Sequence, residues 1–320
     1  MIPARVVFHL DPKYFDRFHE AKHLALYPRI AEIIARRGGE ISLARRPAGP
    51  LTPKAAKGDG DLHIVESGAS RGVGYLNAAL CYLPGFWHLD PKGVLADSSI
   101  SAQDYDPAGV DPAAAAAFYA DLQTRFAEAR QSRYRQAKAR ADLPAGAVVV
   151  FLQGPLPQRR DQAHMSYADM LRAAALAANG RPVLAKPHPL KVEMGLQTIA
   201  DIRAEGFDIL TSDANVHDLL AAAAVTVSVN SAASLEGFLH GKPAILCGRA
   251  DFANMAETVT APADFPAAMA RALATPRDYA PWFQWYFAER CLALEAPDFE
   301  QRLLAIFKTA GFDAEKLGLR

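Results

Sequence analysis

Hydrophobic positions in the first 90 residues follow the periods of strands and helices in turn. The apolar runs at residues 5–10 (RVVFHL) and 40–46 (EISLARR) predict strands, and the spacing at 24–39 predicts a helix that ends at two glycines. Short apolar runs bounded by turn residues predict further strands at 61–68 (DLHIVESG) and 85–90 (GFWHLD). The chain therefore begins in β-α-β order.

Apolar residues three and four apart from Pro112 to about Arg140 predict one long polar helix, which ADLPAG at 141–146 ends. The 320 residues exceed the usual size of one domain and suggest two domains of about 150 residues each. We therefore place the domain boundary at 141–146, so that the first domain covers 1–143.

Strands and helices alternate regularly in the second half of the chain. The expected strands are 147–154, 181–187, 207–210, 225–229 and 242–248, and the expected helices are 166–179, 196–205, 216–223 and 231–241. Regular alternation of this kind is typical of a parallel sheet with helices on both faces. The predicted fold class is α/β, with a second domain at 144–278.

The last part of the chain is rich in aromatic residues at helical spacing, more than an isolated terminal helix needs. We expect residues 279–320 to form helices that pack across the domain junction and return to the N-terminal domain. Trp282, Trp285 and Phe287 should then be buried.

Composition and charge exclude several classes of protein. The chain is 51% hydrophobic, with 22 prolines and 21 glycines, which suits a globular protein and not a disordered one. Its 35 basic residues balance 35 acidic ones, so no net field attracts nucleic acid or an anionic membrane. Any anion must be bound locally.

Cysteines and the N-terminal segment bear on location. Cys81, Cys247 and Cys291 stand far apart without C-x-x-C spacing, which predicts neither a disulfide framework nor a zinc site and favours a reducing compartment. The segment MIPARVVFHL is too short for a signal peptide core or a membrane span. We expect a cytoplasmic protein and leave peripheral contact with the inner membrane open.

The stretch VLAKPHPLKV at 183–192 places His188 at the end of an expected strand, between Pro187 and Pro189. Open parallel sheets bind ligands beyond the carboxyl ends of their strands, and the prolines hold the imidazole on a stiff support. His188, Lys186 and Pro189 are therefore candidate ligand contacts. The alternatives are a histidine that only bonds a neighbouring carbonyl and a solvated lysine.

A second candidate is VTVSVNSAASLEG, where an apolar strand stops at Asn230 and Ser231 and a helix begins. The free N–H groups and the dipole of a helix start attract anions. Asn230 or Ser231 could equally be only an N-cap, and Ser234 only a small packing residue.

Together the two stretches resemble the nucleotide-binding half of a two-Rossmann (GT-B) glycosyltransferase, with Glu236 available for a ribose hydroxyl. K-P-H-P followed by VNSAASLEGFLHGKPAILCG resembles the capsule-polysaccharide biosynthesis family of bacterial Kdo transferases. VESGASRGVGYL, FWHLDPKGVLADSSIS and YDP in the first half extend the resemblance over about 60–290. It implies two Rossmann-like domains that face a cleft, with acceptor binding in the first and nucleotide-sugar binding in the second.

This resemblance also implies a chemistry. The donor would be CMP-linked 3-deoxy-octulosonic acid (CMP-Kdo), with His188 and Ser231 on its CMP part. Transfer with retention would use an aspartate nucleophile and a glutamate that handles the acceptor proton, and the matching residues are Asp161 and Glu66. Paired carboxylates are what a double displacement needs. The alternatives are an Asp161 paired with a neighbouring arginine and a Glu66 that only caps a turn.

The resemblance is incomplete near Glu66. Ala69 and Gly72 stand where relatives tend to carry a bulky apolar residue and a serine, and the loop 153–161 is long and basic. Arg71 is present and could bind the carboxylate of Kdo or of the acceptor through a bidentate pair, or be a simple surface arginine. These departures from the family pattern are consistent with a different acceptor or with loss of the transferase activity.

The leading hypothesis is a transferase of Kdo to a saccharide or glycolipid acceptor in surface-polysaccharide synthesis, with no cofactor and no metal. His217 with Asp213 and Asp218 lacks a third ligand at metal spacing. The alternatives are a transferase of CMP-sialic acid or another nucleotide sugar, and a catalytically degenerate homologue that binds nucleotide or glycan in a polysaccharide assembly complex.

Overall fold

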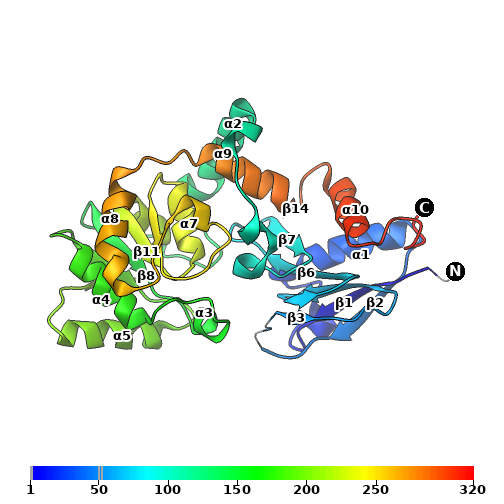
Figure 1. Cartoon of the computed structure of the whole chain (residues 1–320), viewed down its shortest axis with the longest axis horizontal. Helices are drawn as coiled ribbons and strands as arrows, with labels where there is room; N and C mark the ends of the chain where they lie inside the picture. Colours follow the sequence, from blue (N-terminus) through cyan, green and yellow to red (C-terminus); the bar gives the residue numbers. More distant parts are fainter. Residues whose placement is uncertain (1–2, 50, 52) are drawn as a thin grey trace. The chain divides into compact units, whose positions relative to one another are not determined.

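Two mostly parallel sheets organise the computed structural model, which describes residues 3–49, 51 and 53–320 (Figure 1). Each sheet belongs to its own structural unit. The first unit contains the described residues up to Gln103 together with Tyr286–Arg320, and the second contains Asp104–Trp285. The units therefore meet along the chain at positions different from the predicted boundaries after residues 143 and 278.

The sheet of the first unit has the order β14-β7-β6-β4-β1-β2, in which β7 and β14 are antiparallel to their neighbours and the other pairs are parallel. Its strands are β1 (Val6–Leu10), β2 (Ile41–Arg45), β4 (Leu62–Glu66), β6 (Tyr75–Leu80), β7 (Phe86–Asp90) and β14 (Leu292–Ala293). A separate parallel pair joins β3 (Lys54–Ala55) and β5 (Ser70–Arg71).

Two helices cover one face of this sheet, α1 (Leu26–Arg36) and α10 (Phe299–Thr309). Alternate strand residues such as Phe8 and Ile64 form one apolar core with both helices. Since β2 and β4 lie on opposite sides of β1, the strand order reverses at the β1/β4 pair. That is the place where α/β sheets of this kind bind ligands.

The strand β6 is missing from the sequence prediction, although it lies inside the sheet. Its middle position is Asn77, which is completely buried and breaks the apolar pattern. The Asn77 side-chain oxygen accepts a hydrogen bond from the Ser70 N–H, and its side-chain nitrogen donates to the carbonyls of Ser70 and Asp90. This buried amide fixes the loop after β4.

The sheet of the second unit is parallel throughout, in the order β10-β9-β8-β11-β12-β13. Its strands are β8 (Ala147–Phe151), β9 (Val183–Lys186), β10 (Leu210–Thr211), β11 (Ala223–Ser228), β12 (Ala244–Leu246) and β13 (Glu257–Thr258). Numbered along the chain, this is the doubly wound order 3-2-1-4-5-6 of dinucleotide-binding folds. The predicted α/β class with Rossmann-like units is confirmed.

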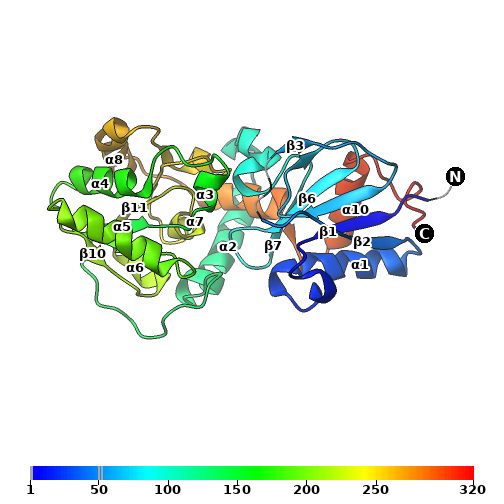
Figure 2. The same ribbon diagram turned by 90° about the horizontal axis from the view of Figure 1, so that it is seen from below.

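Helices cover both faces of this sheet, as the alternation predicts. The helices of the unit are α2 (Pro112–Leu122), α3 (Leu156–Arg159), α4 (Tyr167–Ala177), α5 (Val192–Ala204), α6 (Val216–Ala222), α7 (Ala232–Phe238), α8 (Phe265–Ala274) and α9 (Ala280–Phe283). One apolar core joins α4, α5 and α8 to the sheet, and α4 and α5 lie side by side (Figure 2). A second core joins α6 to the opposite face.

The predicted long helix at 112–140 is shorter than expected and belongs to the second unit. Helix α2 continues as a π-helical segment, Gln123–Glu128, and no regular element follows before β8. Tyr119 and Gln123 donate hydrogen bonds to the carbonyls of Phe238 and Leu239 at the end of α7. These contacts explain why the boundary of the unit precedes this helix.

The aromatic segment near residue 285 contributes side chains to both units. Helix α9 continues as a π-helical segment, Gln284–Arg290. Trp282 donates a hydrogen bond of 3.0 Å to Asn254 in the second unit, and Phe287 packs edge-to-face on Phe86 in the first. The predicted burial of Trp282, Trp285 and Phe287 is confirmed.

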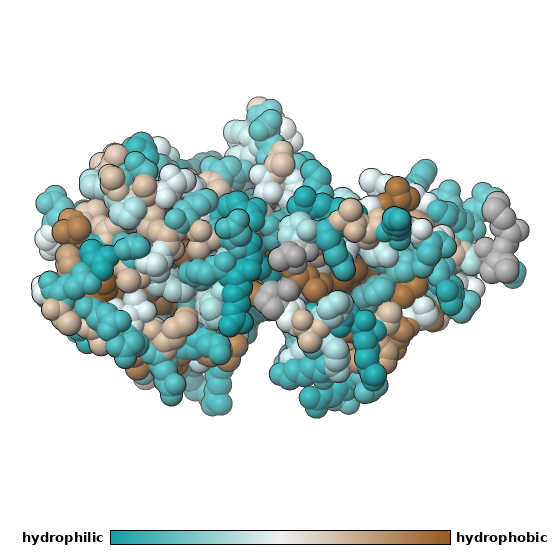
Figure 3. All heavy atoms as spheres, turned by 60° about the horizontal axis from the view of Figure 1, so that its bottom comes forward, coloured by the Kyte–Doolittle hydropathy of each residue, from teal (hydrophilic) through white to brown (hydrophobic). Residues whose placement is uncertain are grey.

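Hydrophilic side chains cover most of the face shown in Figure 3, and hydrophobic ones form small separate areas. The most exposed large apolar side chains, Val73, Leu176 and Leu190, come from separate segments. Within the part of the chain that the structure describes, no helix has the length and hydrophobicity that crossing a bilayer requires.

Candidate functional site

The second unit gathers its candidate residues at the carboxyl ends of three adjacent strands. Lys186 ends β9 and His188 follows it, Gln153 follows β8, and Asn230 with Ser231 follows β11. Because β8 lies between β9 and β11, the ends of the two outer strands are about 10 Å apart. The strand order reverses between β8 and β11, so this edge is the ligand-binding position of a doubly wound sheet.

His188 is held so that one ring nitrogen is fixed as a donor. Its Nδ1 accepts a hydrogen bond of 3.1 Å from the backbone N–H of Leu190, so the neutral imidazole carries its proton on Nε2. Burial lowers the pKa of His188, and the cations of Arg133 and Lys191 lower it further. The alternative in which His188 only bonds a neighbouring carbonyl is wrong, because its backbone partner is the N–H group of Leu190.

The surroundings of His188 add residues that sequence reasoning missed. The ring of Tyr134 packs edge-to-face on the imidazole, with 5.2 Å between the centroids. Arg133 and Lys191 are exposed cations close enough to act on its pKa. Lys191 stands three residues after His188 in the quoted stretch, so its basic charge was a visible signal, whereas Arg133 comes from the loop after the π-helical segment.

Lys186 is bound to the protein, whereas Pro189 is exposed. The Lys186 ammonium donates a hydrogen bond of 2.7 Å to the carbonyl of Ala214, and burial lowers its pKa. Lys186 therefore ties β9 to the start of α6 and is not the solvated lysine of the alternative reading. Pro189 is exposed and Pro187 is buried. A ligand role for Lys186 or Pro189 stays a prediction.

The start of α7 is capped by Ser231, whose Oγ accepts a hydrogen bond of 3.2 Å from the N–H of Ala233. The helix has only seven residues, shorter than predicted. Ser234 is completely buried and shares a hydrogen bond of 2.8 Å with Ser228. In this structure Ser234 is a packing residue out of reach of a ligand, which corrects its assignment to the nucleotide site.

Glu236 is also inaccessible in this structure. Its Oε1 accepts a hydrogen bond of 2.8 Å from Ser132, and its Oε2 lies 3.7 Å from His217 Nε2. Complete burial raises the pKa of Glu236 to about 8. The predicted contact with a ribose hydroxyl would therefore require the segment that carries Ser132 to move.

Asp161 lies on the loop between α3 and α4, at a φ of +53°. Asp adopts this left-handed conformation more readily than most residues. The loop is anchored beside the end of β12, because Arg249 donates its backbone N–H to the Gln162 carbonyl and Ala163 forms a bridge with Gly248. The exposed Asp161 carboxylate forms no ion pair or hydrogen bond within the described chain, so the alternative in which it pairs with Arg159 or Arg160 is wrong.

Glu66 ends β4 in the first unit, at the point where the order of that sheet reverses. Its Oε2 accepts a hydrogen bond of 2.7 Å from the N–H of Asp11 and lies 3.3 Å from Arg46 Nε. Arg46 also pairs with the Asp11 carboxylate at 2.9 Å. Since both contacts use Oε2, the other carboxylate oxygen of Glu66 stays available among the described residues.

The neighbourhood of Glu66 explains one departure from the resembled pattern. A Cβ on Gly72 would lie 2.3 Å from the carbonyl oxygen of Ala56, so serine does not fit beside the β3/β5 pair. Ala69 is buried. Arg71 is exposed and donates a hydrogen bond of 3.3 Å to the carbonyl of Lys92. Its predicted role toward a carboxylate stays a prediction.

Sequence comparison matches part of the second unit. Residues 159–267 match the family model described as capsule polysaccharide biosynthesis protein. This segment is similar to that family. It contains Asp161, His188 and Ser231, so the resemblance inferred from the motifs is confirmed on the capsule-family segment. No curated protein sequence matches the chain with significant similarity.

Structural comparison covers nearly the whole chain. The β-Kdo 2,7-transferase of Thermosulfurimonas dismutans KpsC aligns with a TM-score of 0.55 at 12% identity, covering 96% of this chain and 99% of that one. The β-Kdo 2,4-transferase of the same KpsC aligns with a TM-score of 0.48 at 17% identity, covering 82% and 89%. At these identities the first alignment supports a common fold.

Proposed function

We propose that this chain is a glycosyltransferase that moves Kdo from CMP-Kdo onto a saccharide or glycolipid acceptor in capsule or related surface-polysaccharide synthesis. The observation that carries the proposal is the fixed Nε2–H of His188 at the carboxyl edge of a doubly wound sheet, inside the capsule-family segment. The protein would work on the cytoplasmic side of the inner membrane, where nucleotide sugars are made, with peripheral contact to its lipid acceptor.

The charges near His188 suit the phosphate of a nucleotide sugar. An imidazole N–H can donate to a phosphate oxygen, and exposed Lys191 and Arg133 add two positive charges. Such groups stabilise the charge that develops on a departing nucleotide. The resemblance of K-P-H-P and N-S to Kdo transferases selects CMP among the nucleotides.

We assign the chemical step to Asp161 and Glu66, with retention of configuration. The Asp161 carboxylate would attack the anomeric carbon while the bond to the CMP phosphate breaks and CMP leaves with the electron pair. The acceptor hydroxyl would then displace Asp161 from that carbon and give its proton to Glu66. Among the residues that the structure describes, the Asp161 carboxylate has no partner and the second oxygen of Glu66 stays available, which supports these roles.

The proposal is tested by donor turnover. Release of the nucleotide, CMP from CMP-Kdo and CMP-sialic acid and UDP from a UDP-sugar, would be followed with and without saccharide acceptors. Of the three donors, we expect only CMP-Kdo to be consumed, and we expect the acceptor to increase the rate of CMP release. Turnover of CMP-sialic acid or of the UDP-sugar in place of CMP-Kdo would replace the donor while keeping the reaction class.

One observation favours the degenerate homologue as a second candidate. Arg46 and the Asp11 N–H already bind one oxygen of Glu66, which gives this carboxylate a structural role independent of catalysis. Such a protein would bind CMP without consuming any donor. Tight CMP binding with no turnover of the three donors would favour this second candidate.

A further inference from the structure

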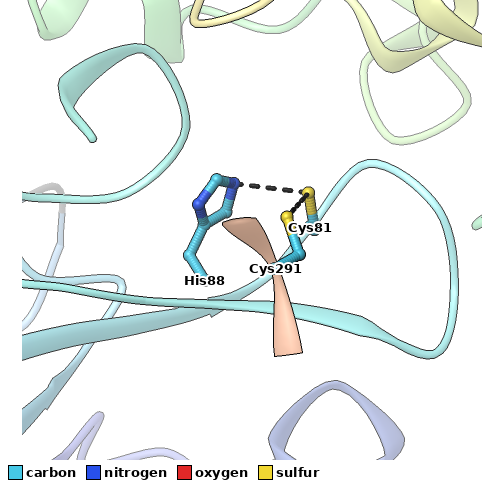
Figure 4. Close-up of side chains that lie close together, drawn as sticks. All are labelled: Cys81, His88 and Cys291. Carbon is cyan, nitrogen blue, oxygen red and sulfur yellow. Dashed lines mark hydrogen bonds between the residues drawn. The ribbon is translucent and has the colours of Figure 1, made fainter. Parts of the chain in front are cut away.

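Two cysteines that are 210 positions apart lie side by side in the first unit, together with a histidine (Figure 4). Cys81 follows β6, His88 is in β7, and Cys291 directly precedes β14. All three side chains are buried, and their sulfur and nitrogen ligand atoms lie within 4.8 Å of one another. Because Cys81 and Cys291 are so far apart in the sequence, cysteine spacing did not predict this cluster.

The distances within the cluster fit a tetrahedral metal centre. Cys81 Sγ lies 3.7 Å from Cys291 Sγ and 3.3 Å from His88 Nε2. With Zn–S bonds near 2.3 Å and Zn–N bonds near 2.0 Å, tetrahedral angles place two sulfurs about 3.8 Å apart and a sulfur and a nitrogen about 3.5 Å apart. The two spacings from Cys81 therefore match those of Zn²⁺ ligands, and Cys291 and His88 lie within 4.8 Å of each other.

A hydroxyl group that could be the fourth ligand lies beside these three side chains. The hydroxyl of Tyr286 lies 3.4 Å from His88 Nε2 and 3.8 Å from Cys81 Sγ. Two thiolates would balance the charge of one Zn²⁺, so the completed centre would be neutral. Neutrality matters here because an unpaired charge in a site this deeply buried is strongly unfavourable.

We propose that Cys81, His88 and Cys291 bind a structural Zn²⁺ ion, with Tyr286 at the fourth position. Each thiol loses its proton to solvent as its Zn–S bond forms, so binding releases two protons and the apparent affinity rises about a hundredfold per pH unit below the thiol pKa. The ion would fasten the returning segment at the edge strand β14 to its neighbour β7, with which β14 pairs.

The ion should be measured directly in the purified full-length protein. Elemental analysis should find about one zinc per chain, and replacement with Co²⁺ should produce thiolate-to-cobalt charge-transfer bands with the intense d–d bands of tetrahedral coordination. Because the ligands are buried, chelators should remove the ion slowly from the folded protein and quickly in denaturant.

Variants assign the ligands. Cys81→Ser, Cys291→Ser and His88→Gln should each lower the zinc content and the cobalt charge-transfer absorption. Cys247→Ser is the matched control, because Cys247 is a buried thiol in the second unit, and it should keep the full zinc content. Tyr286→Phe should keep the zinc and change the d–d bands.

Three outcomes would overturn the proposal. One is wild-type protein with less than a tenth of a zinc per chain that also gives no charge-transfer band with added Co²⁺. Another is a mass two daltons below that of the reduced chain after isolation with reductant present, which would show a Cys81–Cys291 disulfide. Equal zinc loss in Cys247→Ser would place the metal elsewhere. The wild-type measurements decide even where a variant fails to fold.

Discussion

Gln153 and Asn230 bind each other through two hydrogen bonds across the point where the strand order of the second unit reverses. The Asn230 N–H donates to Gln153 Oε1, and Gln153 Nε2 donates to Asn230 Oδ1, both at 3.0 Å. The Asn230 amide also donates to the Arg249 carbonyl at 2.9 Å. Asn230 therefore positions the loops around the candidate site, and its N–H groups are committed to the protein.

Gln153→Ala should lower the free energy of unfolding by about 1 to 3 kcal/mol, because it leaves the Asn230 N–H without its partner. Gln197→Ala is the matched control, since Gln197 is exposed and its side chain bonds Asp201 within the same helix, α5. That change should stay within about 0.5 kcal/mol. Equal effects of both substitutions in urea unfolding would contradict a structural role of the Gln153–Asn230 pair.

Glu236 should make the protein less stable as the pH rises from 6.5 to 8. Burial raises its pKa to about 8, so the folded state keeps a proton that the unfolded chain, with a pKa of 4.5, has lost. This stabilisation is complete below pH 4.5 and is lost as the pH rises through about 8, at up to about 1.4 kcal/mol per pH unit. Lowered histidine pKa values, such as that of His240 at about 4, act below pH 6.5 and with the opposite sign.

Unfolding measured in urea across this range should show a loss of roughly 2 kcal/mol in the wild type, from the slope above. Glu236→Gln should remove this loss because the amide does not titrate. Glu295→Gln, at an exposed glutamate, should retain it. A Glu236→Gln protein with the wild-type slope would show that another group causes the pH dependence.

Asp161→Asn should abolish turnover of CMP-Kdo while CMP affinity stays within a few fold, because the nucleophile acts on the way to the transition state. Asp208→Asn, at an exposed aspartate in the same unit, is the control and should retain full activity. Glu66→Gln should impair transfer and allow a Kdo adduct on Asp161 to accumulate, visible in the intact protein mass. Turnover by Asp161→Asn at the wild-type rate would exclude this aspartate.

The C-terminal segment should be essential for stability. Leu303 in α10 is completely buried in the core of the first unit, so Leu303→Ala should cost about 2 to 5 kcal/mol. Leu273→Ala, at a leucine that is 39% exposed, should cost much less. Truncation after residue 280 removes β14 and α10 together and should lower the melting temperature sharply. An unchanged melting temperature would show that this segment is dispensable.

The local sequence pattern was sufficient to predict most helices and strands and the strand end at His188, because apolar periodicity and the positions of prolines depend on only a few neighbouring residues. It failed where long-range packing decides. Asn77 lies in the middle of a buried strand because distant backbone groups bind its amide. Glu236 appeared accessible in the sequence, whereas Ser132, over a hundred positions earlier, covers it. The proximity of Cys81 to Cys291 likewise depends on how the chain returns to its first unit.

The central claim is tested most directly by calorimetric titration with CMP, UDP and GDP. We expect CMP to bind most tightly, and His188→Ala to weaken it by about 1 to 3 kcal/mol, or roughly fivefold to over a hundredfold. His188→Gln, which keeps a side-chain N–H donor, should retain part of that affinity. Preferential binding of UDP or GDP, or a folded His188→Ala protein with unchanged CMP affinity, would contradict the account.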